Sequence, residues 1–510
     1  MSMVKEPVGL ASERSFLSTR RGALTLALLL AFQFLDTLDA SIVFVALPSI
    51  QHELGFSQQS LQWVISGYLL TYGGFLLLGG RAADLLGRRR VLVAGATIFG
   101  VCSLLAGLAT SPEILIAARL AQGVGAAIMT PAGLSILTTT FTGGDRVKAL
   151  GAWAAMAGLS SAVGVFVGGL LSEGPGWRWI FFVNLPVLAI AIAAAFRLIP
   201  AERRNARLAN FDALGAVLVT GGMLLLVHAL INAPDIGWGD PRTIGELAGS
   251  GLVLAAFALN EQRHRNPLFP FAIFRIKGLA AADATQLIAF AGFYSQFFFI
   301  TLYLQNVLGF SPIKAGAALL PVAVLFATAA GVSSKLFART GTRPVIVAGA
   351  LLGAAGIYYL SRIPVAGSYV SDLLPGLAIM SVGFGAVFVG SITAANAGVP
   401  ADKAGLAAGL INTSAQLGAA LGLAIFSAIA TAQTNDLLRA TNPDRLRALT
   451  AGYEDALLAC AIFVLAAAAI ALRTFNTRGE VPVPPASSEA GAPLSAHSTV
   501  RSATSQEKVT

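Results

Sequence analysis

The sequence predicts an all-α integral membrane protein with fourteen transmembrane helices, and three observations lead to this prediction. Apolar residues make up 56% of the 510-residue chain and charged residues only 12%, whereas a soluble domain has ~25% charged residues. Fourteen stretches are apolar and long enough to cross a bilayer as helices. Lys and Arg gather in alternate loops between those stretches. The basic residues that give the formal net charge of +9 are thus placed as membrane topology requires. We therefore expect no nucleic acid partner.

Each apolar stretch approaches the ~20 residues that a membrane helix needs, and short polar loops separate consecutive stretches. The fourth opens with Ser111 and Pro112, an N-cap followed by proline at the first helical position. The stretches start near Gly22, Leu61, Val91, Ile114, Ala149, Trp179, Phe211, Ile244, Leu279, Ile313, Pro344, Leu373, Leu406 and Leu457.

The distribution of basic residues predicts the orientation, because Lys and Arg favour the cytoplasmic side of a membrane protein. With a cytoplasmic N-terminus, 26 of the 34 Lys and Arg residues fall in cytoplasmic segments and 7 fall outside. Arg119 alone lies within a span. We therefore expect both chain termini in the cytoplasm, which agrees with an even number of spans.

Two loops that lie eight spans apart resemble one another and suggest an internal repeat. Residues 80–90 read GRAADLLGRRR and residues 334–343 read SKLFARTGTR, with Gly87 aligned on Gly341. Transporters are often built from such repeats, although any tight cytoplasmic turn favours glycine and arginine. Two six-helix halves then flank two inserted helices. The predicted parts are a cytoplasmic segment 1–21, a six-helix bundle 22–205, a two-helix insert 206–262, a second six-helix bundle 263–477 and a disordered cytoplasmic tail 478–510.

The sequence contains no motif for nucleotide or metal chemistry. No lysine follows a glycine, which excludes a phosphate-binding loop of the Gly-x-x-x-x-Gly-Lys type. The chain has four histidines and no His-Glu-x-x-His zinc motif. We expect no cofactor, no metal and no enzymatic activity.

Three charged residues inside the predicted spans require an explanation, since charge within a bilayer is costly unless it is paired or hydrated. Asp36 and Asp39 share one helix face in the first span. Asp39 lies roughly 13 Å and Arg119 of the fourth span roughly 9 Å below the same membrane surface. An aspartate beside a cation stays ionised, and a substrate that disturbs the pair can change when the proton leaves. We expect a proton-coupling role for all three residues; the alternative is an ion pair that only holds the two helices together.

Asp283 lies one turn into the ninth span and shares a helix face with Gln286. It is a candidate for a second protonation or cation site. The alternative is an aspartate that the helix dipole favours near a helix N-terminus.

Aromatic and amide side chains in several spans are candidates for substrate binding. Aromatic walls with a few polar groups suit apolar or amphiphilic ligands, and aromatic rings beside a carboxylate also suit organic cations. Such rings in membrane helices can equally pack or face lipid. The candidates are Tyr68, Tyr72, Phe75, Gln122, Trp153, Tyr294, Phe297, Asn412 and Gln416.

Several motifs in this order resemble the major facilitator superfamily between about residues 25 and 475. Residues 80–89 resemble its signature loop, and residues 115–127 (LIAARLAQGVGAA) its fourth-helix motif with a buried arginine. Residues 38–48 (LDASIVFVALP) and 177–186 (WRWIFFVNLP) are similar to the fourteen-helix drug:proton antiporters, the EmrB/QacA subfamily. Residues 266–269 (NPLF), followed by Phe274 and Arg275, are also typical of that subfamily.

The resemblance implies a major facilitator fold, 6 + 2 + 6 helices, and a gate at the signature loop. There Asp84 would lock one conformation with the help of Gly80, Gly87 and Arg88. Ser160, Gly164, Gly168 and Gly169 fit the antiporter motif of the fifth helix, and small residues at this spacing let helices approach closely. Val165 stands where that motif has proline, and Phe44 replaces an asparagine of the first-helix motif.

The predicted function is proton-coupled multidrug efflux, the export of hydrophobic or cationic small molecules by alternating access. Its partners would be the substrate, protons and membrane lipids, and the protein would be a monomer in the cytoplasmic membrane of a bacterium. The alternative within transport is a proton-linked or facilitated carrier of lipids or a metabolite, which Val165, in place of proline, leaves open. A transporter-like sensor or membrane enzyme is an alternative of another class.

Overall fold

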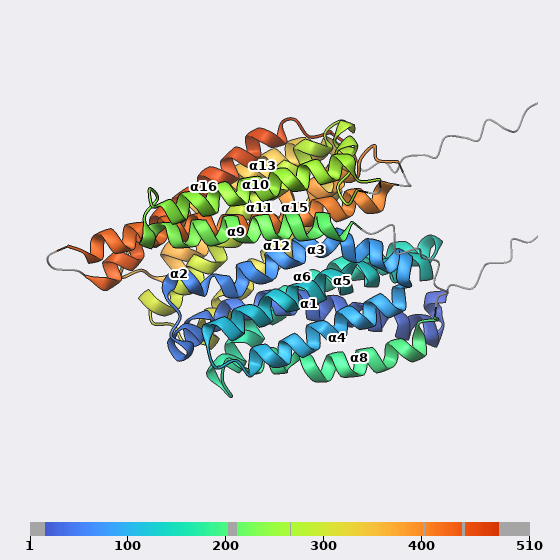
Figure 1. Ribbon diagram of the computed structural model, residues 1–510, viewed down its shortest axis with the longest axis horizontal. Helices are drawn as coiled ribbons and strands as arrows, with labels where there is room; N and C mark the ends of the chain where they lie inside the picture. The colour runs from blue at the N-terminus through green and yellow to red at the C-terminus, as the bar shows by residue number, and fades with distance from the viewer. Residues whose placement is uncertain (1–15, 202–211, 266, 401–402, 441–443, 479–510) are drawn as a thin grey trace, which may run out of the picture. The chain divides into compact units, whose positions relative to one another are not determined.

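The computed structural model describes residues 16–201, 212–265, 267–400, 403–440 and 444–478, and over these ranges it is built of helices and loops without strands (Figure 1). Residues Met1–Gly479 belong to one compact unit. Fourteen helices are long and apolar enough to span a membrane, which confirms the predicted number of spans. The predicted tail lies almost wholly outside the described residues, as does most of segment 1–21 and the boundary between residues 205 and 206.

The helices follow the apolar stretches in chain order. Those of the first half are α1 (Arg20–Leu54), α2 (Gln58–Leu61), α3 (Trp63–Leu86), α4 (Arg88–Gly107), α5 (Pro112–Thr140), α6 (Gly143–Glu173), α7 (Trp179–Phe182) and α8 (Asn184–Leu198). Next come α9 (Ala213–Ile236) and α10 (Pro241–Arg263). The remaining ones are α11 (Leu279–Leu302), α12 (Pro312–Thr340), α13 (Thr342–Leu360), α14 (Leu374–Asn396), α15 (Ala404–Leu438) and α16 (Arg445–Ala471). Short 3-10 or π turns add η1 (Phe16–Ser18), η3 (Phe271–Arg275), η4 (Tyr303–Val307) and η5 (Tyr369–Leu373).

Two predicted helix starts were wrong because polar residues extend helices beyond their apolar stretches. Helix α16 begins at Arg445 rather than near Leu457, since the Asp444 side chain caps its first turn by accepting from the backbone of Leu446 and Arg447. Helix α6 begins at Gly143 rather than near Ala149. The predicted start near Phe211 lies outside the described residues.

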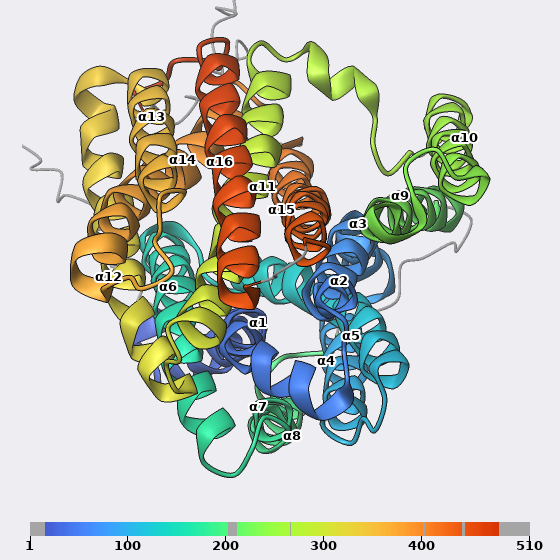
Figure 2. The same ribbon diagram turned by 90° about the vertical axis from the view of Figure 1, so that its left-hand side faces the viewer.

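The helices pack in two groups. Within the first, α1 packs against α6 and α8, and α5 against α3 and α4; within the second, α11 packs against α15 and α16, and α13 against α14 and α16. Helices α9 and α10 pair with each other, and α9 packs on both α3 and α15 (Figure 2). One helix of the insert therefore contacts a helix from each group.

Equivalent turns join consecutive helices in the two groups. Gly87 separates α3 from α4 with φ 96°, and Gly341 separates α12 from α13 with φ 84°. Residues other than glycine rarely adopt this region of φ. The two loops that resemble each other in sequence thus both need a residue with positive φ at the turn, and both have glycine there.

The groups meet closely at the end of the bundle where α1 finishes, which we call the Leu54 end. Gln305 Nε2 donates to the Val45 carbonyl at 2.9 Å, and Glu173 accepts from the Ile313 amide at 3.0 Å. Toward the opposite Arg20 end, a methyl added to Gly158 of α6 would just contact Ala327 of α12, whereas Gly151 has open space around it. Helices α6 and α12 therefore diverge away from the Leu54 end.

Close helix contact in the first group depends on glycine, which gives a test of the packing. A Cβ at Gly125 of α5 would lie 2.6 Å from the Phe99 amide nitrogen in α4. We expect Gly125→Ala to lower the unfolding free energy by about 1–3 kcal/mol, because the helices must separate. Gly331→Ala in α12 is the matched control, since nothing lies within 4 Å of the added methyl. Thermal unfolding of purified protein in detergent measures both, and equal midpoints would contradict the packing.

Candidate functional site

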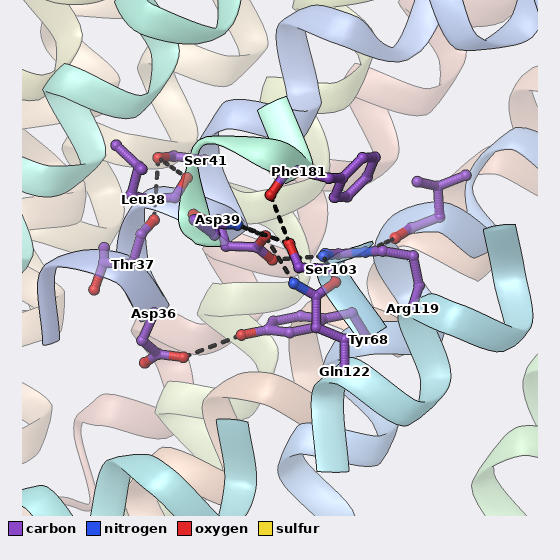
Figure 3. A network of polar contacts seen from close by, with 12 residues as sticks. Asp36, Thr37, Leu38, Asp39, Ser41, Tyr68, Ser103, Arg119, Gln122 and Phe181 are labelled. Atoms are coloured by element: carbon purple, nitrogen blue, oxygen red, sulfur yellow. Dashed lines mark hydrogen bonds and ion pairs between the residues drawn. The ribbon is translucent and has the colours of Figure 1, made fainter. Parts of the chain in front are cut away.

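A fully buried ion pair lies at the centre of the first helix group. Asp39 of α1 and Arg119 of α5 are 0% and 1% exposed, and Arg119 Nη1 lies 2.5 Å from Asp39 Oδ2. Figure 3 shows the two side chains converging with Gln122. Their estimated depths in the membrane had suggested that the two side chains could approach each other, and in the structure they make direct contact.

Both carboxylate oxygens of Asp39 are satisfied. Gln122 Nε2 and Asn184 Nδ2 each donate to Oδ1 at 2.9 Å, while Arg119 occupies Oδ2. Hydrogen bonds in which the donor or the acceptor is ionised are stronger than those between neutral groups. Asp39 thus has a guanidinium and two amide donors as partners, and the formal charges of Asp39 and Arg119 compensate each other.

Arg119 is fixed by contacts beyond its carboxylate. Its Nε donates to the Val64 carbonyl at 2.9 Å, and Nη1 also donates to Gln122 Oε1 at 2.8 Å. The guanidinium carbon lies 4.3 Å from the centre of the Tyr68 ring, a cation–π distance. These contacts anchor α5 to α1 and α3 through a single side chain.

Two polar residues of this network were missed as site residues by sequence reasoning. Asn184 at the start of α8 contacts Asp39 and also donates to Ser103 Oγ of α4 at 3.1 Å, and Ser103 donates to the Phe181 carbonyl at 2.9 Å. The available signal was an asparagine within an otherwise apolar stretch. Buried polar groups need partners, which could have pointed to it.

Asp36 forms a second acidic centre beside the ion pair. It is 5% exposed, and it accepts hydrogen bonds from the hydroxyls of Tyr68 and Tyr72, both at 3.0 Å. Tyr68 therefore touches both centres, with its hydroxyl on Asp36 and its ring on Arg119. The two tyrosines that we considered for substrate binding are buried partners of an acid in this conformation.

The other aromatic and amide candidates fall in different surroundings. Tyr294 and Phe297 of α11 lie 5.2 and 6.4 Å, centre to centre, from the Phe44 ring of α1, so they join the two groups. Phe75 and Trp153 are half-buried against the core. Gln416 packs on Gly73 of α3, and Asn412 is exposed and bonds its own helix through the Ala408 carbonyl.

The predicted gate residues lie at the Arg20 end. Asp84 is exposed and lies 3.8 Å from Arg88, one turn away, and Arg88 Nη1 donates to Thr139 Oγ1 of α5 at 3.2 Å. Gly87 makes the turn between α3 and α4, and Gly80 lies near Pro131 of α5. Asp84 thus lies beside an arginine in this conformation.

The glycine stripe of α6 packs on two different partners. Side chains at Gly164 and Gly168 would collide with Ser41 and Ile42 of α1, whereas one at Gly169 would collide with Pro312 of α12. Gly169 therefore belongs to the contact between the groups, and its neighbours belong to the first group.

The second helix group contains one buried acid of its own, Asp283 of α11, which is 5% exposed. Ser414 Oγ lies 3.4 Å from its Oδ1. Among the described residues, no group of three His, Cys, Asp or Glu side chains could hold a metal ion.

A bundle of fourteen apolar helices with a neutralised acid–base pair in its interior defines a multi-pass membrane protein that holds charge within the bilayer. Sequence comparison identifies which kind. Residues 29–423 match the Major Facilitator Superfamily, and the chain belongs to this family. The protein is therefore a transporter of small molecules rather than an enzyme, and a multi-pass protein of the bacterial cytoplasmic membrane. The superfamily and fold predicted from the motifs are confirmed.

Similar proteins of known name include antibiotic resistance and export proteins. The puromycin resistance protein pur8 of Streptomyces alboniger is 40% identical over 413 residues, covering 80% of this chain and 82% of that protein. The cephamycin export protein CmcT of Amycolatopsis lactamdurans is 36% identical over 459 residues, covering 89% and 93%. These names agree with the drug-exporter resemblance of the motifs.

Solved structures with the same fold are more distant in sequence. A bacterial homologue of the human lysosomal transporter Spinster has a TM-score of 0.61 at 18% identity, covering 89% of this chain and 97% of that one. The nucleoside transporter NupG has a TM-score of 0.61 at 14% identity, covering 87% and 99%. They support the fold alone.

The buried pair predicts a specific pattern of stability. Arg119→Gln leaves the Asp39 carboxylate buried without its cation, and we expect a loss of about 3–5 kcal/mol in unfolding free energy. The double variant Asp39→Asn/Arg119→Gln removes both charges and should recover most of that loss. Thermal unfolding in detergent provides the comparison, and a double variant less stable than Arg119→Gln alone would contradict the proposed cost of an unpaired charge.

Proposed function

We propose that the protein exports antibiotic-like small molecules, hydrophobic or cationic, in exchange for protons. The observation that carries this proposal is its likeness, over most of both chains, to proteins named for puromycin resistance and cephamycin export. Aromatic residues where the two helix groups meet, such as Phe44 and Tyr294, suit ligands of this kind.

Proton coupling is proposed to act through Asp39 and Arg119, with Asp36 next to them. The two side chains are paired and fully buried in this conformation, so access of a proton to Asp39 requires Arg119 to move away. A carboxylate that loses its cation inside a bilayer binds a proton more readily. A substrate or helix movement that separates the pair therefore changes the affinity of Asp39 for a proton, and this supplies the link between transport and the proton gradient.

The proposed orientation has both termini in the cytoplasm, so the Arg20 end faces inward and the Leu54 end outward. In this orientation the contacts of Gln305 and Glu173 close the outer side, and α6 and α12 diverge toward the cytoplasm. Alternating access would then require these outer contacts to break while the inner ends approach. Asp84 and Arg88 lie on the side that would close, in keeping with the proposed gate.

The proposed organisation keeps two six-helix bundles, 22–205 and 263–477, with insert 206–262 between them. Helix α9 packs on one helix from each group, so the insert is placed to follow both during a cycle. We propose that the monomer is the working unit and that lipids surround it, since each group has its own buried acid.

The function is tested by dye efflux from energised bacterial cells that produce the parent chain, Asp39→Asn or Asp436→Asn, each with and without a protonophore. We expect the parent to export the dye and both Asp39→Asn and the protonophore to abolish export. Asp436→Asn is the matched control, because this aspartate is exposed near the Leu54 end of α15 and should export as the parent does.

Each variant must be expressed at the parental level and remain folded at the assay temperature for the comparison to hold. If dye leaves all strains as slowly as cells that lack the protein, drug export is the wrong function, and carriage of a lipid or metabolite replaces it. If the parent exports dye unaffected by the protonophore, transport stands and proton coupling does not.

A further inference from the structure

Asp283 is the least compensated of the buried acids in the described helices. It lies one turn into α11, is 5% exposed and accepts a single hydrogen bond, from Ser414 Oγ at the long distance of 3.4 Å. Its second oxygen, Oδ2, is buried without a hydrogen-bond partner. Such an oxygen cannot carry negative charge in an apolar interior without a large free-energy cost.

The buried acids of the first helix group have more hydrogen-bond partners than Asp283 has. Asp39 has a guanidinium and two amide donors, and Asp36 has two tyrosine hydroxyls. Asp283 has one weak hydroxyl contact. The neighbours of Asp39 and Asp36 thus compensate a buried carboxylate, whereas those of Asp283 do so only weakly.

A second orphan acceptor lies on the same face of α11. Gln286 follows Asp283 by three residues, is 1% exposed, and its Oε1 is also buried without a partner. Residues three apart on a helix are neighbours. Asp283 Oδ2 and Gln286 Oε1 are thus two acceptors without partners on one helix face, and a proton on Asp283 would convert its carboxyl from an acceptor into a donor.

The charged groups around this position are few and distant along the helices. Among the described residues, α14 has no charged side chain, and Lys403, Arg275, Lys277 and Arg473, on segments that adjoin α15, α11 and α16, are exposed. On α16, Glu454 and Asp455 lie toward the Leu54 end, away from Asp283. Ser414 is the hydrogen-bond partner of Asp283, and no ion pair of Asp283 is found over the described ranges.

A metal cation fits this place less well than a proton. Asp283, Gln286 and Ser414 offer three orphan or weakly bound oxygens at most, whereas hard cations such as Ca²⁺ take about 6–8 oxygen ligands. A proton needs one carboxylate oxygen, and Asp283 Oδ2 is buried without a hydrogen-bond partner.

We propose that Asp283 is a second proton-binding site, which carries its proton in the conformation described and acts separately from Asp39. Gln286 and Ser414 are its positioning residues. When water reaches this part of α11 during the cycle, the O–H bond of the Asp283 carboxyl breaks, the proton passes to that water, and the carboxylate becomes hydrated. The proposal rests on proton-coupled export and deepens it: each helix group holds one proton-exchanging acid, and the cycle moves more than one proton.

A direct test is infrared spectroscopy of the purified protein, which reports the C=O stretch of a protonated carboxylic acid without any substrate. We expect a band that titrates away as pH rises, part of which is lost in Asp283→Asn and all of which remains in Asp39→Asn. Ser414→Ala should hold the band to higher pH, since it removes the one donor that favours the carboxylate. Asp283→Glu should keep a titrating band, and Asp436→Asn should match the parent. A band lost in Asp39→Asn but kept in Asp283→Asn would overturn the proposal.

The transport test uses proteoliposomes with an imposed pH difference and the dye exported by the parent. Each coupled proton contributes about tenfold in dye accumulation per unit of pH difference. Asp283→Asn should therefore lower accumulation about tenfold at one unit, while dye–dye exchange continues at the parental rate. Accumulation equal to that of the parent would overturn the proposal, as would accumulation that follows sodium and ignores pH.

The two proposals fail in distinguishable ways. If the parent moves no dye, drug export fails, while the infrared titration still decides whether Asp283 holds a proton. If the parent accumulates dye and Asp283→Asn does so equally, export stands and the second proton site fails. Thermal unfolding of each variant excludes a loss of fold as the cause.

Discussion

The ion pair of Asp39 and Arg119 constrains the whole first helix group, because neither charge can stay in an apolar interior without the other. Each partner then requires further polar neighbours. Asn184 brings α8 to the pair, the Val64 carbonyl brings α3, and Tyr68 connects it with Asp36. Helices that are far apart in the chain are thus held in one arrangement by hydrogen-bonding demand, in a medium where apolar burial discriminates little between partners.

Close packing complements this polar core. Glycines of α6 let its backbone approach α1 on one side and α12 on the other. In a contact made by backbone and small side chains, few side chains interdigitate. Such a contact suits helices that must separate and pack together again. The polar pair fixes helices within a group, while the glycine contact at Gly169 joins α6 to α12 between the groups, near the Leu54 end. Rigid groups with one changeable boundary are what alternating access requires.

The two groups treat their buried acids differently. Asp39 and Asp36 are satisfied by side chains of their own group, whereas Asp283 has a weak partner and an orphan oxygen. The charge of a carboxylate paired with a cation can change only when the helices that carry the pair move apart. The charge of an acid without such a cation can change by gain or loss of a proton alone. Under the proposed mechanism, the acid of the first group would exchange its proton when helices move, and Asp283 would do so when water reaches it.

The sequence by itself determined the number of spans, the superfamily and the acids that need an explanation, because transfer of apolar segments into a bilayer and a charge within a span are local properties of the chain. It misplaced the starts of α6 and α16, where polar caps extend the helices past the apolar stretches. Only the tertiary structure decided that Asn184 contacts Asp39 from 145 residues away and that Ser414 is the single partner of Asp283 from 131 residues away. Such contacts depend on which helices become neighbours and on how each is rotated about its axis, and helical spacing within one span does not contain that information.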